Sequence, residues 1–290
     1  MAHQERKKIM KTWKKIILGV SLISLFLGGG FVAWGYSQGG LTDLQNQTKS
    51  EQDYVKKEVK DFNKIDIKSS SYNVLIKNGD VDKATLSYYQ KTKNPIDTSV
   101  KDGQLTINDN NSELDSTSNK HINFFGLKDL VRLSTLNKEV RNKTIVITLP
   151  KKQTIDFLKV DLATGNLDLS NSTIKQADIH LNVGDLTFTK MIVSNLKANL
   201  DVGSVDSDHT LFTNSDLSIA MGDYSGDNMI FNGHNKLDVT SGDIEIALKD
   251  YTLNVQADSH SGEGDITNNL KISKDNTLTI TSDLGDITVE

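Results

Sequence analysis

The stretch LDVTSGDIEI, from Leu237 to Ile246, decides the fold of this chain of 290 residues. Apolar and polar residues alternate on both sides of its Gly-Asp pair, and the same phrase returns throughout residues 159–290. The repeated glycines are spaced by 19, 19, 19, 20, 22 and 21 residues: Gly165, Gly184, Gly203, Gly222, Gly242, Gly264 and Gly285. A period of this length indicates an array in which each unit buries its apolar face against its neighbour.

The alternation predicts two short strands joined by a corner in each copy of the repeat. In the copy quoted above, Leu237 and Ile244 would point inward, glycine allows a positive φ at the corner, and aspartate hydrogen-bonds the local backbone. Ser207, Gly226 and Asn268 stand where a second inward side chain is expected, so these places must be packed differently. We predict an all-β domain that is a β-solenoid of parallel strands with 19–22 residues per turn. An antiparallel sandwich, whose strands recur at similar spacing, is the alternative.

The N-terminal part of the sequence predicts a membrane anchor. Residues 1–15 are basic, and residues 16–36, IILGVSLISLFLGGGFVAWGY, carry no charge. A helix of this length spans about 31 Å, which matches the apolar core of a bilayer. The basic segment is expected in the cytoplasm and the remainder of the chain outside the cell. We predict one uncleaved transmembrane signal anchor; a signal peptide cleaved near Ala33 and Gly35 is the alternative.

Between the anchor and the repeats, residues 37–61 are polar and predict a partly helical stalk. The period-two pattern that follows predicts an extracellular β-repeat domain over residues 62–290. Its first segment, Ile67–Ile76, is similar to the repeat with serine in place of glycine.

An insertion at residues 108–143 interrupts the β-repeat domain. It contains an apolar cluster that is a candidate interaction patch: Phe124, Phe125 and Leu127. One interpretation is a helix or loop that caps the end of the stack, which terminal repeats need for solubility. The other is a patch that contacts the membrane or a partner protein.

The last strand of the sequence is a second candidate for interaction. The sequence ends on LGDITVE, with no later segment to cover that strand. An uncovered strand pairs readily with another chain. We therefore predict a pairing edge for self-association or partner binding: Asp286, Ile287, Thr288 and Val289.

Composition and charge disfavour several classes of function. The absence of cysteine excludes disulfides and thiolate metal sites. The net charge is −5, and residues 1–36 carry +5, so residues 37–290 carry −10. An acidic body of this kind disfavours binding to nucleic acid, which requires a basic surface.

No motif indicates catalysis, a cofactor or a metal. The six histidines stand at no metal-ligand spacing, and no nucleophile elbow, P-loop or dinucleotide fingerprint occurs. The aspartates that follow the repeat glycines suggest calcium as an alternative. Calcium-binding β-rolls, however, repeat every nine residues with several glycines per turn. We therefore expect no enzyme, no cofactor and no metal site, and interpret these aspartates as turn residues.

Four segments, together with the Gly-Asp repeats, resemble a known family: FNKIDIKSSSYNVLIKNGD (Phe62–Asp80), KDGQLTI (Lys101–Ile107), INFFG (Ile122–Gly126) and IVITLPKKQTIDFLKVDLATGNLDL (Ile145–Leu169). Its members are membrane-anchored bacterial proteins with a β-strand-repeat domain labelled "putative adhesin", including LiaG-like proteins of envelope-stress operons. The resemblance covers residues 62–290 and departs from the family at Ser70-Ser71, where a Gly-Asp turn is common. It implies an extracellular role in stress sensing or adhesion and brings no catalytic residues.

Together these features predict a single-pass protein of the cell membrane, with its N-terminus in the cytoplasm and its C-terminal domain outside. The expected function is a non-enzymatic binding or scaffold module of the bacterial cell envelope. Besides the membrane, which residues 16–36 would cross, the expected partners are an envelope or sensor protein or a cell-wall polymer. A surface adhesin and a carbohydrate-active enzyme on a β-helix are the alternatives.

Overall fold

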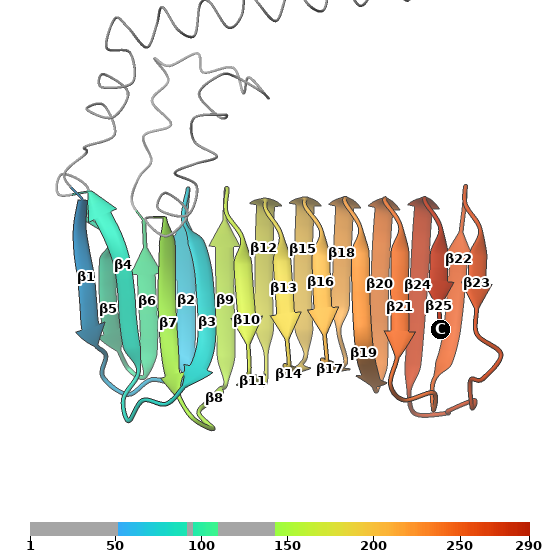
Figure 1. Ribbon diagram of the computed structural model, residues 1–290, viewed down its shortest axis with the longest axis horizontal. Coiled ribbons are helices and arrows are strands. Elements are labelled where there is room, and N and C mark those ends of the chain that lie inside the picture. The colour runs from blue at the N-terminus through green and yellow to red at the C-terminus, as the bar shows by residue number, and fades with distance from the viewer. Residues whose placement is uncertain (1–51, 92–94, 110–142) are drawn as a thin grey trace, which may run out of the picture. The chain divides into compact units, whose positions relative to one another are not determined.

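The computed structural model describes residues 52–91, 95–109 and 143–290. The chain divides into two units, Met1–Gln52 and Asp53–Glu290, and the description concerns the second. Its strands lie side by side in stacked coils (Figure 1). The expected anchor at residues 16–36 lies outside the described residues, and within them no helix is long and apolar enough to cross a membrane.

The strands form three faces of the stack. One face is a ten-stranded sheet, in spatial order β5(Asp97–Lys101), β6(Gln104–Asn108), β2(Lys64–Ser69), β9(Phe157–Leu162), β12(Ala177–Val183), β15(Leu196–Val202), β18(Asp216–Met221), β20(His234–Ser241), β24(Thr277–Leu284) and β22(Asn254–Ser259). The second face consists of β1(Gln52–Glu58), β4(Thr85–Lys91), β7(Thr144–Pro150), β3(Asn73–Gly79), β10(Leu167–Ser170), β13(Leu186–Thr189), β16(Val205–Asp208), β19(Tyr224–Asn232), β21(Ile244–Leu248), β25(Ile287–Val289) and β23(Gly264–Ile266). The third, narrow face contains the end of β19 and four short strands: β8(Thr154–Ile155), β11(Thr173–Ile174), β14(Ile192–Ser194) and β17(Leu211–Thr213).

The register of the central coils confirms a solenoid-like fold. Leu186 pairs with Val205, and Val205 pairs with Tyr224, so equivalent positions lie 19 residues apart. These pairs are parallel, as are those on the ten-stranded sheet and the narrow face. The antiparallel sandwich is therefore excluded, and the antiparallel pairs β4–β7 and β5–β6 lie only at the N-terminal end of the stack.

The corner between the ten-stranded sheet and the second face requires glycine. Gly203 has a φ of 147°, and a Cβ atom there would lie 1.9 Å from the carbonyl oxygen of Gly184. Gly184 itself would bring a Cβ atom to 2.1 Å from the carbonyl oxygen of Gly165. Successive corners therefore stack backbone against backbone, and only glycine permits both the dihedral angle and this approach.

The aspartates of the corners have a different role from the one predicted. The Asp223 side chain accepts a hydrogen bond of 2.9 Å from the backbone N–H of Asp243, and Asp243 accepts one of 2.9 Å from Asp286. The prediction that aspartate hydrogen-bonds its own local turn is wrong, because each side chain reaches the equivalent residue of the neighbouring coil. These residues tie coils together.

The core is continuous along the stack, and large side chains fill the space beside the small inward residues. Phe188 and Phe212 are fully buried and meet edge to face, with ring centroids 5.1 Å apart. Ser207 and Gly226 stack in register, and a Cβ atom on Gly226 would lie 3.1 Å from the ring of Tyr224. The Tyr224 ring therefore fills the space that these two small residues leave.

The order of the coils at the C-terminal end differs from the order of the sequence. β24 lies between β20 and β22, and β25 lies between β21 and β23. The coil of β22 and β23 is thus the outermost one, as Figure 1 shows. The apolar residues Leu278, Ile280 and Ile287 of the last sequence repeat are buried by neighbours on both sides. The preceding repeat offers few apolar side chains and therefore suits an end position.

The prediction that Gly264 is a corner glycine is wrong. Gly264 pairs with Ile287 within β23 and has open space around it, whereas a Cβ atom on Gly262 would lie 2.1 Å from the carbonyl oxygen of Gly285. Gly262 is therefore the corner glycine of the outermost coil. The spacings of 22 and 21 residues in the sequence are not spacings between stacked corners, and Asn268 is not an inward position of this coil.

The N-terminal end is also out of sequence order. β2 lies between β6 and β9, and β3 lies between β7 and β10. The segment Ile67–Ile76 does form a coil, as its similarity to the repeat predicted, with serines at the corner. β4 and β5 then cover the coil of β6 and β7 with antiparallel strands.

The predicted stalk ends earlier than residue 61. Gln52–Glu58 form β1, which lies beside β4, and the side chains of Val59 and Phe62 are buried. A partly helical stalk through residue 61 is therefore wrong for this part, because these residues add a strand to the domain. The remainder of the stalk, and residues 110–142 of the insertion, lie outside the described residues.

The corner glycines permit a matched test of stability. Gly203→Ala places a methyl group against the Gly184 carbonyl oxygen, so we expect a loss of more than about 2 kcal/mol and a clear fall in the thermal midpoint. Gly264→Ala should change stability by less than about 0.5 kcal/mol, because its surroundings are open. Thermal unfolding followed by circular dichroism compares the two variants. Equal midpoints would contradict the stacking constraint.

Tyr224 permits a test of the core. The hydroxyl groups of Tyr224 and Ser207 are buried without a hydrogen-bond partner. Tyr224→Phe should therefore change stability by less than about 1 kcal/mol, whereas Tyr224→Ala should cost roughly 3–5 kcal/mol.

Burial raises the pKa of Tyr224 above its ordinary value of 10.0, and burial also raises the pKa of Tyr72 to about 12. Both phenols hold their protons more tightly when folded, so their stabilising contribution is complete below pH 10 and is lost as the pH rises further.

Denaturation midpoints measured at increasing pH test the sign of this effect. The wild-type midpoint should fall above pH 10, and Tyr224→Phe should reduce the fall. A midpoint that rises with pH in this range would overturn the assignment of a buried neutral phenol.

Candidate functional site

The structure describes one of the two predicted interaction sites and not the other. Phe124, Phe125 and Leu127 lie outside the described residues, so that patch stays a prediction. The predicted pairing edge at Asp286–Val289 is wrong, because β25 is hydrogen-bonded between β21 and β23. Self-association through that strand would require a free side that it does not have.

An exposed apolar ladder follows the glycine corners along the stack. The residue before each of four corner glycines is apolar and is 48%, 40%, 56% and 56% exposed, respectively: Val183, Val202, Met221 and Leu284. These positions pair in register from β12 through β15, β18 and β20 to β24. Ser241 of β20 occupies the position between Met221 and Leu284. Large apolar side chains so exposed and so regularly stacked are typical of an interaction surface.

A polar ladder runs beside it on the other side of the glycines. Each side chain accepts a hydrogen bond from the backbone N–H of the equivalent residue in the next coil, at 2.8–3.3 Å: Asn73, Asn166, Asp185, Ser204, Asp223, Asp243 and Asp286. The backbone of this edge is therefore held rigidly, and binding would require little rearrangement.

We call the part of these ladders around Gly184, Gly203, Gly222, Gly242 and Gly285 the corner edge, which consists of residues 182–186, 201–205, 220–224, 240–244 and 283–287. It contains no lysine, arginine or histidine and six aspartates: Asp185, Asp201, Asp223, Asp243, Asp283 and Asp286. Close by, the pKa of Asp168 is raised, chiefly by burial and also by the neighbouring Asp185 carboxylate, although a hydrogen bond with Thr187 acts in the opposite direction. The corner edge thus combines four exposed apolar residues with six aspartates and, within these five segments, no cationic residue.

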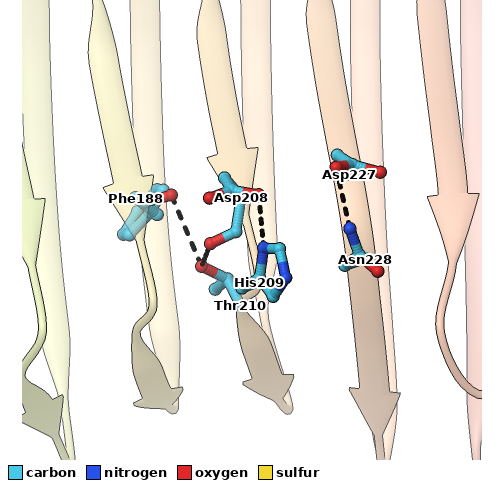
Figure 2. Close-up of polar contacts among 6 residues, drawn as sticks. All are labelled: Phe188, Asp208, His209, Thr210, Asp227 and Asn228. Atoms are coloured by element: carbon cyan, nitrogen blue, oxygen red, sulfur yellow. Dashed lines mark hydrogen bonds and ion pairs between the residues drawn. The ribbon is translucent and has the colours of Figure 1, made fainter.

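The opposite end of the second face carries a separate polar group, drawn in Figure 2. Asp208 and Asp227 pair in register, and His209 has a φ of 49°, with its Nδ1 atom 2.6 Å from Oδ1 of Asp208. The ligand atoms of Asp208, His209 and Asp227 lie within 4.8 Å of one another, and among the described residues this is the group with a metal-ligand composition.

This group is more simply explained as a set of surface hydrogen bonds. The side chains of His209 and Asp208 are 47% and 46% exposed, and Asp227 accepts a hydrogen bond from Nδ2 of Asn228 at 2.8 Å. An exposed pair of this kind contributes little to stability, about 0–1 kcal/mol. We assign no metal to it, and the expectation of a protein without a metal site stays a prediction.

The sequence contained a signal for the corner edge that the pattern of alternation obscured. In the repeated phrase, the position before the glycine is a variable one between the inward residues. Aligning the repeats at the glycine places valine, valine, methionine and leucine at that position in four copies. Their exposure could not be deduced, because an inward and an outward apolar side chain look alike in a sequence.

The fold defines a class of proteins in which parallel β-coils are stacked into a column with exposed corners. Residues 62–290 match the family model described as Toastrack DUF4097, and the chain belongs to that family. The resemblance seen in the sequence is confirmed at this level.

No curated protein matches the chain. Among solved structures, it is similar to a "putative cell adhesion protein" from Clostridium sporogenes, at 15% identity over 82% of this chain and 99% of that chain, with a TM-score of 0.31. A "putative adhesin" from Bacteroides fragilis matches at 15% identity over 83% and 98% of the two chains, with a TM-score of 0.35. One from Parabacteroides distasonis matches at 14% identity over 80% and 98%, with a TM-score of 0.28.

Asp223 separates the structural role of the polar ladder from its charge. Asp223→Asn keeps an oxygen that accepts the Asp243 N–H, so stability should stay within about 0.5 kcal/mol. Asp223→Ala removes the acceptor and should cost about 1 kcal/mol. Chemical denaturation of both variants gives the comparison. An equal loss in both would show that the charge, and not the hydrogen bond, stabilises the corner.

Proposed function

We propose that this protein is a membrane-anchored binding or scaffold module of the bacterial cell envelope. In this proposal residues 16–36 cross the membrane, residues 1–15 stay in the cytoplasm, and the column is displayed outside. The resemblance to LiaG-like proteins supports a link to the envelope-stress response. The partner would be an envelope or sensor protein.

The observation that carries the proposal is the corner edge. Its apolar side chains are exposed on a backbone that successive glycines and cross-coil hydrogen bonds hold in place. Five stacked positions at about 4.8 Å each extend over about 19 Å, enough to receive an extended or helical segment of a partner. Such an edge favours recognition of a protein over chemistry on a small molecule.

An enzyme that acts on carbohydrate fits the described residues less well. Sugar-binding grooves use exposed aromatic rings with clustered acids and cations, and Tyr54 is the single aromatic residue among the large apolar side chains that are exposed in the described part of the chain. A surface adhesin would use the same corner edge toward a different partner. A cell-wall polymer with anionic groups would be repelled by the six aspartates of that edge.

Site-specific photo-cross-linking tests the proposal. A photoreactive residue replaces Val202 on the corner edge or, as the matched control, Lys197 at the other end of the same strand, β15, in the full chain in native membranes. We expect a discrete adduct with an envelope protein from position 202 and none from position 197, and Met221→Asp should abolish the adduct. Cells are compared with and without an antibiotic that damages the cell wall.

The outcomes distinguish the candidate functions. An adduct with a membrane kinase or another sensor component supports the scaffold, and an adduct with an external surface protein supports the adhesin. The absence of any adduct at position 202, or the same adduct from both positions, would overturn the proposal.

A further inference from the structure

The corner edge offers both apolar contact and negative charge. Its four exposed apolar side chains lie among six aspartates, with no cationic residue in the five corner segments. Anionic lipid headgroups and anionic polymers are repelled by such a surface. The complementary occupant is a segment that combines large apolar side chains with lysine and arginine.

This chain contains a segment of that composition. Residues 120–142 carry five cationic and two acidic residues, which gives a net charge of +3: Lys120, Lys128, Arg132, Lys138 and Arg141 against Asp129 and Glu139. They also carry nine apolar residues: Ile122, Phe124, Phe125, Leu127, Leu130, Val131, Leu133, Leu136 and Val140. A cationic segment in an otherwise acidic body is complementary to the corner edge.

The segment leaves and rejoins the column on the side where the corner edge lies. The backbone N–H of Asp109 donates to the Lys68 carbonyl, and a carboxylate oxygen of Asp109 lies 3.1 Å from the Ser69 hydroxyl, which donates to it. Where the chain returns, the Asn73 N–H donates to the carbonyl of Lys143. These serines and Asn73 form the corner next to that of Gly165. Asp109 and Lys143, the described residues on either side of the insertion, are therefore held beside the polar ladder.

The length of the chain allows the contact. Four and five steps between coils separate β6 from β15 and β18, which carry Val202 and Met221, or about 19 Å and 24 Å at about 4.8 Å per coil. The residues between Asp109 and Lys120 reach up to about 36 Å when extended, at about 3.3 Å per residue.

We propose that residues 120–142 of this chain bind the corner edge of their own column, with apolar side chains on Val202 and Met221 and cationic side chains against the aspartates. The inference rests on the proposed function, because it assigns an intramolecular occupant to the same binding edge. An external partner then replaces this segment and presents the same chemistry: a cationic, apolar peptide segment.

Disulfide formation in the full chain tests the contact, because the natural sequence has no cysteine to interfere. The test variant combines Gly126→Cys, which keeps the neighbouring phenylalanines, with Val202→Cys on the corner edge. The matched control combines Gly126→Cys with Lys197→Cys, which is exposed on the same strand but distant from the edge. Both are purified in detergent and oxidised under the same conditions, and intrachain disulfide formation is followed on non-reducing gels.

We expect the intrachain disulfide to form at least about fivefold faster in the Val202→Cys variant, because binding raises the effective concentration of the two thiols. Adding Asp223→Asn and Asp243→Asn should lower that rate several-fold, because the amides keep the polar ladder but remove two charges. Raising the salt concentration should act in the same direction.

Three outcomes would overturn the inference. Equal intrachain rates in the test and control variants show that the segment has no preference for the edge. A disulfide between chains identifies a second copy as the occupant. Insensitivity to both the asparagine substitutions and salt removes the argument from charge. If position 202 still captures an envelope protein by photo-cross-linking, the proposed function stands while this inference fails.

Discussion

The close stacking of corner glycines is the constraint on which the column depends. Each corner glycine of the regular coils has a φ between 138° and 152°, and a Cβ atom on it would clash with a backbone carbonyl oxygen of the neighbouring coil. Any side chain there would force the coils apart and break the parallel register on the adjoining faces. The same geometry turns the preceding residue outward and directs the next N–H to the neighbouring coil. The exposed apolar ladder and the polar ladder are thus consequences of the same corner.

This corner explains why the domain tolerates polar and small residues elsewhere. Ser207 and Gly226 occupy inward positions, yet Tyr224 fills the space above them from a neighbouring inward position. Because the backbone pairing holds the coils in register, a large inward side chain can fill the space that a small one leaves in the adjacent coil. The core is therefore filled by groups of neighbouring coils together and not by each coil alone.

The sequence predicted the fold class well and the ends of the stack poorly. The period, the inward alternation and the serine-containing coil at Ile67–Ile76 all followed from local pattern. The placement of β25 did not, because nothing local distinguishes a strand with one neighbour from a strand with two. The corner edge was hidden for a similar reason: Val202 and Met221 are apolar, and only their position beside the glycine turns them toward solvent.

The sequence by itself determined the repeat, the strand-corner-strand unit and the glycine at each corner, because backbone dihedral preference and alternation act within about ten residues. Only the tertiary structure decided which coils are neighbours, so that the last repeat lies inside and the one before it lies at the end. The order of the coils depends on how much apolar surface each whole coil buries. The repeat with Leu278, Ile280 and Ile287 gains more from two neighbours than the less apolar repeat of β22 and β23 would. The same stacking brought single exposed residues into one continuous edge.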